Sequence, residues 1–154
     1  MKAITVWQPW ASLKATNAKQ YETRSWSTTY RGPIAIHAAK KKPSSLWDAI
    51  EGIVDKVRAA LGVVDLDELP RGAIIATGEL VGCWEIHEDG DDVFIDKYDS
   101  KDAHGMTWIS PQEYLFGNYR TGRYAWEIVN VKMLDEPVPA RGKQGLWNWE
   151  DAAA

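Results

Sequence analysis

The stretch GAIIATGELVGCWEIH, residues 72–87, is the segment that most limits how this chain can fold. Its run of β-branched and other apolar residues predicts one long β-strand. Two glycines, Gly78 and Gly82, interrupt the pattern. Glycine inside a strand marks a bulge or a close approach by another part of the chain, so we expect irregular pairing at both positions.

Shorter strands and helices are predicted around this strand. One long helix beside short strands predicts an α+β fold with a small, strongly bent sheet or barrel. A chain of 154 residues without internal repeats is expected to form one domain, residues 1–154. Residue patterns predict strands at 2–7, 20–26, 34–38, 123–134 and 146–149, and helices at 9–18, 46–61 and 110–117.

Three polar or Pro/Gly-rich segments, 88–92, 96–110 and 136–145, are expected to be loops or connections. The helix at 46–61 carries one apolar stripe, which we expect to lie in the core. Asn17 follows the first predicted helix and suits a left-handed C-terminal cap.

The net charge of −4 and the pI of about 5.4 argue against strong non-specific binding to nucleic acid, which needs a broad basic surface. A nucleoside, or a short single strand held in a pocket, remains compatible with this charge. Nine tryptophans suggest core packing, a stacking surface, or both.

Cys83 is the only cysteine, which excludes an internal disulfide and a cysteine-based zinc site. His37, His87 and His104 lack metal-ligand spacing, so we expect neither a metal nor another cofactor. The first residues lack the apolar run of a signal peptide, and no stretch is long enough to span a membrane. A cytoplasmic location is expected, while nothing indicates an oligomeric state.

The segment NAKQYETRSW, residues 17–26, places several ionisable groups in a predicted strand. Alternation puts Glu22 and Arg24 on one face and Thr23 on the other, while Lys19 lies at the junction with the preceding helix. One interpretation is a solvated face. The other is a polar cluster at the mouth of a pocket, where a carboxylate holds the Lys19 ammonium and Arg24 offers a fork of donors.

Residues 17–24, NAKQYETR, resemble the G-x-K-x-x-E-x-R signature of the ASCH domain (activating signal cointegrator homology), a relative of PUA domains. Two positions depart from the family: Asn17 replaces the usual glycine, and Lys14 stands where an apolar residue is expected. VWQPWASL resembles the opening strand–helix junction of the family, and YRGPIAIHAAK resembles the strand that follows the signature. GRYAWEIVNVKML and PVPARGKQGLWNW resemble the closing strands of the tryptophan-rich branch.

The resemblance implies a PUA-like β-barrel with flanking helices, a pocket beside the signature, and RNA or nucleosides as ligands. A small bacterial branch of the family hydrolyses the amide of N4-acetylcytidine. There the signature lysine is catalytic, with a threonine at the position of Glu22 and a glutamate from elsewhere in the chain. Lys19 carries over directly, whereas the threonine does not, because Thr23 is adjacent and faces the other way.

These residues fit a mechanism in which a carboxylate activates water and Lys19 assists. Glu22, or a second carboxylate such as Glu79 or Glu113, would be the base. Glu79 interrupts an apolar strand and needs a partner, for which Lys19 or Arg24 would serve. Glu113, on the predicted helix 110–117, is expected to be solvated unless it has this role.

Trp7 and Trp10 flank the corner between the first strand and helix, where they either stack on a base or close the end of the barrel. His37 is expected to be a hydrogen-bonded structural residue or, with Thr23 and Arg24, part of the substrate site. The leading hypothesis is an amidohydrolase acting on N4-acylated cytosine. A non-catalytic module that binds RNA or a modified nucleoside is the alternative, and a ribonuclease is the third.

Overall fold

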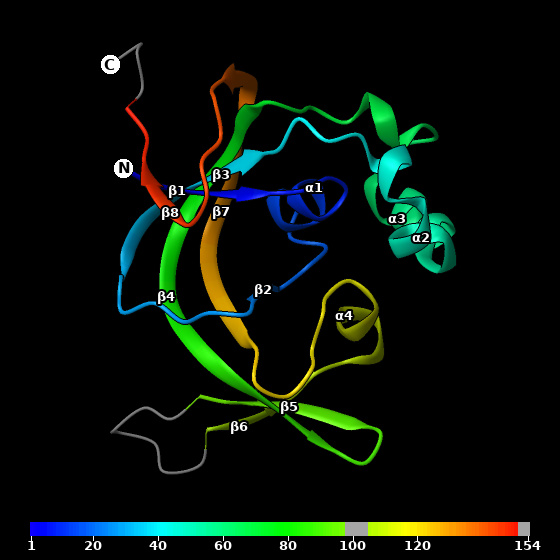
Figure 1. Ribbon diagram of the computed structural model, residues 1–154, viewed down its shortest axis with the longest axis vertical. Helices are drawn as coiled ribbons and strands as arrows, with labels where there is room; N and C mark the ends of the chain where they lie inside the picture. The colour runs from blue at the N-terminus through cyan, green and yellow to red at the C-terminus, as the bar shows by residue number, and fades with distance from the viewer. Residues whose placement is uncertain (98–104, 151–154) are drawn as a thin grey trace.

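The computed structural model describes residues 1–97 and 105–150. Their strands form one eight-stranded sheet with the order β2-β7-β4-β3-β1-β8, which β5 and β6 extend from β4 (Figure 1). The predicted α+β class and PUA-like barrel are confirmed. The strands are β1 (Lys2–Val6), β2 (Tyr21–Arg24), β3 (Gly32–Ala38), β4 (Ala73–Asp89), β5 (Asp92–Asp96), β6 (Met106–Trp108), β7 (Tyr124–Pro139) and β8 (Leu146–Asn148).

The long strand β4 pairs with β7 along most of its length, and the two curve together around the interior (Figure 1). The register shifts around Gly78 and before Gly82, as predicted. At Gly78 a Cβ atom would lie 2.9 Å from both the Val129 carbonyl oxygen and Ile128 Cγ2. Such a contact is shorter than van der Waals separation, so glycine lets the two strands approach where they bend.

Helix α1 (Trp10–Ala15) lies between the sheet and the remaining helices. Ala11 packs with Ile36 and Trp126 in the main core, and the small side chain permits a close approach to the sheet. Leu13 packs with Phe116 in a second cluster under the helical segments. The start of β2 is therefore fixed by an element with packing partners on both sides.

The prediction of one continuous helix at 46–61 is wrong. It is divided into η1 (Pro43–Leu46), α2 (Trp47–Ile50), η2 (Glu51–Ile53) and α3 (Val54–Leu61). Gly52 lies within the break, and glycine weakens a helix interior because it has more backbone freedom to lose. Only part of the predicted stripe is buried, notably Ile50 and Val57, which pack against α1.

Two short strands, β5 and β6, were not predicted from the sequence. The acidic segment at 88–92 is a tight hairpin that joins β4 to β5, with Gly90 at φ 63°. Residues 106–108, which were expected to be irregular, form β6 and pair with β5. Strand β7 also runs on to Pro139, into the predicted connection. The rest of the expected loop, residues 98–104 with His104, lies outside the described residues.

The remaining helical segments are η3 (Leu66–Glu68) and α4 (Pro111–Leu115). Ser110 caps α4 by accepting a hydrogen bond from the Glu113 amide at 3.2 Å. Among the helices of the described residues, none has the length and hydropathy needed to cross a membrane.

Candidate functional site

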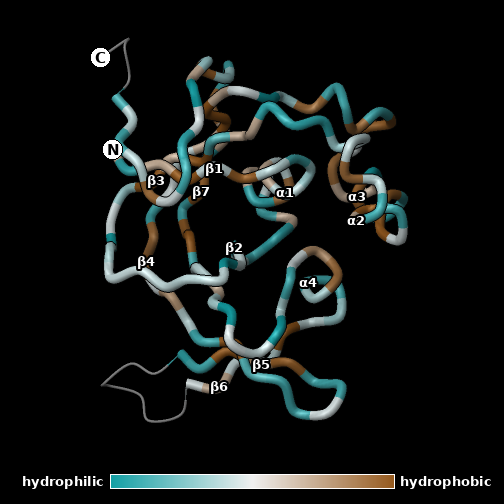
Figure 2. The backbone as a smooth tube through the Cα atoms, viewed as in Figure 1, coloured by the Kyte–Doolittle hydropathy of each residue, from teal (hydrophilic) through white to brown (hydrophobic). Residues whose placement is uncertain are grey.

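A pocket of about 760 Å³ opens beside the signature segment, between the β1–α1 corner, β2 and the residues that follow α4. We call it the signature pocket. Figure 2 shows that the β2 segment in its wall is hydrophilic, although most of β2 is buried. Polar and aromatic residues line much of the pocket: Thr5, Trp7, Trp10, Lys19, Glu22, Thr23, Arg24, Ser25, Trp26, Asn118, Arg120 and Arg123.

Lys19 reaches the pocket because the chain turns sharply after α1. Asn17 takes the predicted left-handed conformation (φ 62°), and the Lys19 amide donates to the Leu13 carbonyl at 2.9 Å. The Lys19 residue is only 1% exposed, and its Nζ donates to the Tyr21 carbonyl at 2.5 Å. A buried ammonium is costly unless it has hydrogen-bond partners, so this carbonyl helps hold the charge at the pocket wall.

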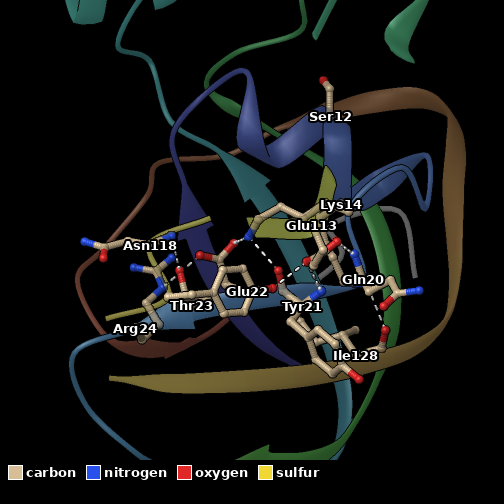
Figure 3. Close-up of polar contacts among 12 residues, drawn as sticks. Ser12, Lys14, Gln20, Tyr21, Glu22, Thr23, Arg24, Glu113, Asn118 and Ile128 are labelled. Atoms are coloured by element: carbon tan, nitrogen blue, oxygen red, sulfur yellow. Dashed lines mark hydrogen bonds and ion pairs between the residues drawn. The ribbon is translucent and has the colours of Figure 1, made fainter. Parts of the chain in front are cut away.

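Glu22 lies between the two cations of the signature, Lys19 and Arg24, and Figure 3 shows it beside Arg24. Its Oε2 is 3.9 Å from Lys19 Nζ, and its Oε1 is 3.6 Å from Arg24 Nε. Both separations exceed a normal hydrogen bond. Glu22 Oε2 is buried without a hydrogen-bond partner among the described residues. The pocket lining thus includes a carboxylate whose Oε2 has unused acceptor capacity, although this atom is shielded from solvent in the conformation described.

Arg24 and Thr23 are fixed by contacts to other elements. Arg24 Nη2 donates to the Thr5 carbonyl of β1 at 2.6 Å, which holds the guanidinium beside the pocket. Thr23 Oγ1 accepts a hydrogen bond from the Asn118 amide at 3.2 Å, and its carbonyl accepts one from Arg123 Nη2 at 3.3 Å. The signature strand is therefore joined to the loop between α4 and β7.

The prediction that Glu113 is solvated is wrong. Its carboxylate is buried and accepts hydrogen bonds from the amides of Gln20 at 2.9 Å and Tyr21 at 3.1 Å (Figure 3). It also accepts one from the Tyr119 hydroxyl at 2.5 Å. Burial and the adjacent Glu113 carboxylate raise the pKa of Tyr119 above its usual range. With three donors already bound, Glu113 anchors the start of β2 and is absent from the pocket lining.

Lys14 is also buried, at 2% exposure, although an apolar residue was expected at this position. Its side chain crosses to β7, where Nζ donates to the Ile128 carbonyl at 2.9 Å (Figure 3). Burial and the nearby Lys19 charge lower the pKa of Lys14 to about 8. The helix thus presents a lysine that bonds to the backbone of the sheet.

The expected pairing of Glu79 with Lys19 or Arg24 is wrong. Glu79 is exposed, and it lies outside the lining of the signature pocket. Its neighbours Gly78 and Leu80 are buried, so strand alternation turns Glu79 toward the opposite face. Glu22 is consequently the only carboxylate among the described residues that line the pocket.

The predicted aromatic residues occupy different positions in the pocket. Trp7 is 49% exposed, and Lys41 Nζ lies 4.6 Å from the centroid of its ring. Trp10 is half-buried and packs against both central core clusters. Trp7 is therefore half-exposed and accessible for stacking although Lys41 lies over its ring, while Trp10 also holds the helix in place. His37 does not line this pocket; it lies in a neighbouring cavity.

Sequence reasoning missed Trp26, Asn118, Arg120 and Arg123, which also line the pocket. Trp26 lies two residues after the signature and makes an edge contact with Trp126, with ring centroids 4.7 Å apart. The other three come from the connection between α4 and β7, which no motif identifies. Their role depends on a loop that only the folded chain brings to β2.

Comparison with known proteins gives one family and two similar curated proteins. The model of the family described as the ASCH domain matches residues 4–138. Activating signal cointegrator 1 of Homo sapiens is 32% identical over 80 residues, and that of Mus musculus is 30% identical over 80 residues. Each match covers 52% of this chain and 14% of the relative, so the similarity is confined to a small part of those longer proteins.

Proposed function

This chain belongs to the ASCH-domain family, a PUA-like, RNA-binding group, and from that premise we propose that it hydrolyses the amide of N4-acylated cytosine, as nucleoside or base. The observation that carries the proposal is the Glu22 carboxylate in the lining of the signature pocket, whose Oε2 lies 3.9 Å from the Lys19 ammonium and has no hydrogen-bond partner among the described residues. A carboxylate that can accept a proton, next to a fixed cation, is one pair of groups that can assist amide hydrolysis by water.

In the proposed reaction, Glu22 accepts a proton from a water molecule as the water oxygen attacks the acyl carbon. The carbonyl π electrons move to oxygen, and the Lys19 ammonium stabilises the negative charge that forms there. Glu22 then gives its proton to N4, and the C–N bond breaks with both electrons going to nitrogen. The products are the free cytosine amine and the carboxylic acid, so one water is consumed for each amide bond.

The substrate's base is proposed to stack on an indole in the pocket. Trp7, Trp10 and Trp26 all line it, and stacking of a base on an aromatic side chain contributes about 1–3 kcal/mol. Arg24 is held by the Thr5 carbonyl through Nη2, which leaves other guanidinium donors for a base edge or the acyl oxygen.

A second candidate function is a binding module for RNA or a modified nucleoside, without catalysis. It is favoured by the arginines of the pocket lining, Arg24, Arg120 and Arg123, which outnumber its single carboxylate. Arginine clusters suit phosphate or base recognition. This candidate predicts saturable binding of a nucleoside or short RNA that is lost in Trp10→Ala or Arg24→Ala, with no product formed.

The two candidates are separated by incubating the purified protein with N4-acetylcytidine and following cytidine and acetate by chromatography. We expect turnover by the wild type and loss of at least about a hundredfold in Lys19→Ala. Lys132→Ala removes an exposed lysine on β7 and is the matched control, which should retain full activity. If wild type and Lys19→Ala are equally inert, the hydrolase proposal fails.

A further inference from the structure

A second cavity, of about 820 Å³, adjoins the signature pocket. The two share Thr5, Trp7, Arg24 and Trp26 in their linings, so Arg24 stands between them. Beyond this boundary the second cavity is lined by the end of β3 and by the segment that joins β7 to β8. We call it the basic groove, after Lys40, Arg141 and Lys143 in its wall.

The charge of the basic groove is opposite to that of the whole chain. Lys40, Arg141 and Lys143 are exposed and join Arg24 there, and the described lining residues include no Asp or Glu. None of the three exposed cations forms an ion pair within residues 1–97 and 105–150. In a chain of net charge −4, these three cations without ion pairs, beside Arg24, whose Nε lies 3.6 Å from Glu22 Oε1, form a local site for an anion.

The segment that carries Arg141 and Lys143 is fixed to the sheet. His37 Nε2 lies 2.7 Å from the Ala140 carbonyl oxygen, and the Ala140 amide donates to the Gly72 carbonyl at 3.1 Å. Gly142 packs so closely that a Cβ there would lie 2.9 Å from His37 Nδ1. These contacts fix the backbone on both sides of Arg141 before any ligand binds, which lowers the ordering cost of binding.

The floor of the groove also contains an unsatisfied polar atom. His37 is 1% exposed, and its Nδ1 is buried without a hydrogen-bond partner among the described residues. Because Nε2 donates to the Ala140 carbonyl, Nδ1 of the neutral ring is an acceptor, so the partner that fits it is a donor such as a sugar hydroxyl or a water, and not a phosphate oxygen.

We infer that the basic groove binds phosphate attached to a nucleoside whose base occupies the signature pocket. The inference rests on the proposed function for the identity of the base. It adds the substrate class, which is a nucleotide or a short strand in preference to a free nucleoside. Arg24 lies where the sugar between base and phosphate would pass, and exposed Trp7 at the same boundary can stack on a flanking group.

The first test compares affinities for N4-acetylcytidine, its 5′-monophosphate and a short RNA that contains it. The groove variant is Lys40→Ala/Arg141→Ala/Lys143→Ala. The matched control is Lys42→Ala/Lys56→Ala/Lys132→Ala, which removes three exposed lysines and the same charge from outside the groove lining. We expect the groove variant to lose about tenfold or more in affinity for a phosphate-bearing ligand while it binds the nucleoside normally.

Salt dependence gives a second readout. The slope of log affinity against log salt concentration for the RNA should fall by about two to three in the groove variant and stay unchanged in the control. A loss already visible with the monophosphate identifies a terminal phosphate as the ligand, whereas a loss confined to the RNA identifies a phosphodiester. If the wild type and the groove variant bind each of the three ligands with the same affinity, the inference is overturned.

A third measurement separates this inference from the proposed function. Titration of ¹⁵N-labelled protein with inorganic pyrophosphate should shift the amide signals of Gly142 and Gly145 in the wild type, and not in the groove variant. If these signals do not move, the phosphate site is overturned whatever the nucleoside does. If they move while N4-acetylcytidine neither binds nor reacts, the phosphate site stands and the proposed function fails.

Discussion

Lys19 Nζ and Glu22 Oε2 are 3.9 Å apart on one wall of a pocket, within salt-bridge range but beyond a hydrogen bond. The ammonium is held by the Tyr21 carbonyl, so it does not depend on the carboxylate for its only partner. In the proposed mechanism, Glu22 is therefore available as the base while a cation stays close to it. The alternative role for Glu22 is to hold Lys19 in position.

Replacement of Glu22 tests that distinction. In Glu22→Gln the shape is kept and the proton acceptor is lost, so we expect kcat for N4-acetylcytidine to fall by about a hundredfold or more, with a small change in KM. Glu79→Gln, on the opposite face of β4, should leave both constants unchanged. A Glu22→Gln enzyme with normal kcat would assign Glu22 to the positioning of Lys19 alone.

Glu113 is expected to contribute stability. In Glu113→Gln one acceptor oxygen is lost, and a donor among the Gln20 amide, the Tyr21 amide and the Tyr119 hydroxyl is left without its partner. The free energy of unfolding should fall by about 2 kcal/mol, measured by urea denaturation. Glu136→Gln, at an exposed position of β7, is the control and should be neutral. Equal urea midpoints for the two variants would show that the hydrogen bonds of Glu113 make no net contribution to stability.

The buried Lys14 predicts a pH dependence of stability. Its pKa is about 8 in the folded protein and 10.5 when unfolded, so the unfolded chain binds more protons between these values. Stability should therefore rise with pH across this window, by about 3 kcal/mol relative to Lys14→Met. Other groups titrate in both proteins, so the difference isolates Lys14. The exposed Lys132→Met should show no such trend, and a constant difference for Lys14→Met would refute the assignment.

The bend of β4 predicts a contrast between two glycines. Gly78→Ala should lower the free energy of unfolding by about 2 kcal/mol, because its Cβ would meet the Val129 carbonyl oxygen at 2.9 Å. Gly52→Ala, in the broken helical region, meets nothing within 4 Å and should be neutral or stabilising by about 0.5 kcal/mol. Thermal unfolding of both variants measures these changes in stability. A similar loss of stability in the two variants would contradict the packing explanation.

Several features follow from the sequence because their causes are local. Two glycines in an apolar run predicted the interrupted pairing of strand β4, and Asn17 predicted the left-handed cap after which the chain turns toward Lys19. Ser110 predicted the N-terminal cap of α4. Each depends on backbone freedom or on a hydrogen bond a few residues away. The spacing of Lys19, Glu22 and Arg24 likewise placed these groups together, because they share a short segment.

The tertiary structure decided which charged groups share the pocket and which do not. Glu113 is buried because amides more than ninety residues away donate to it, and Glu79 is outside because strand register turns it there. The basic groove combines Lys40 with Arg141 and Lys143, which only the return of the chain beside β1 and β3 brings together. Residue pattern fixes local conformation, whereas burial and charge environment depend on partners distant in sequence.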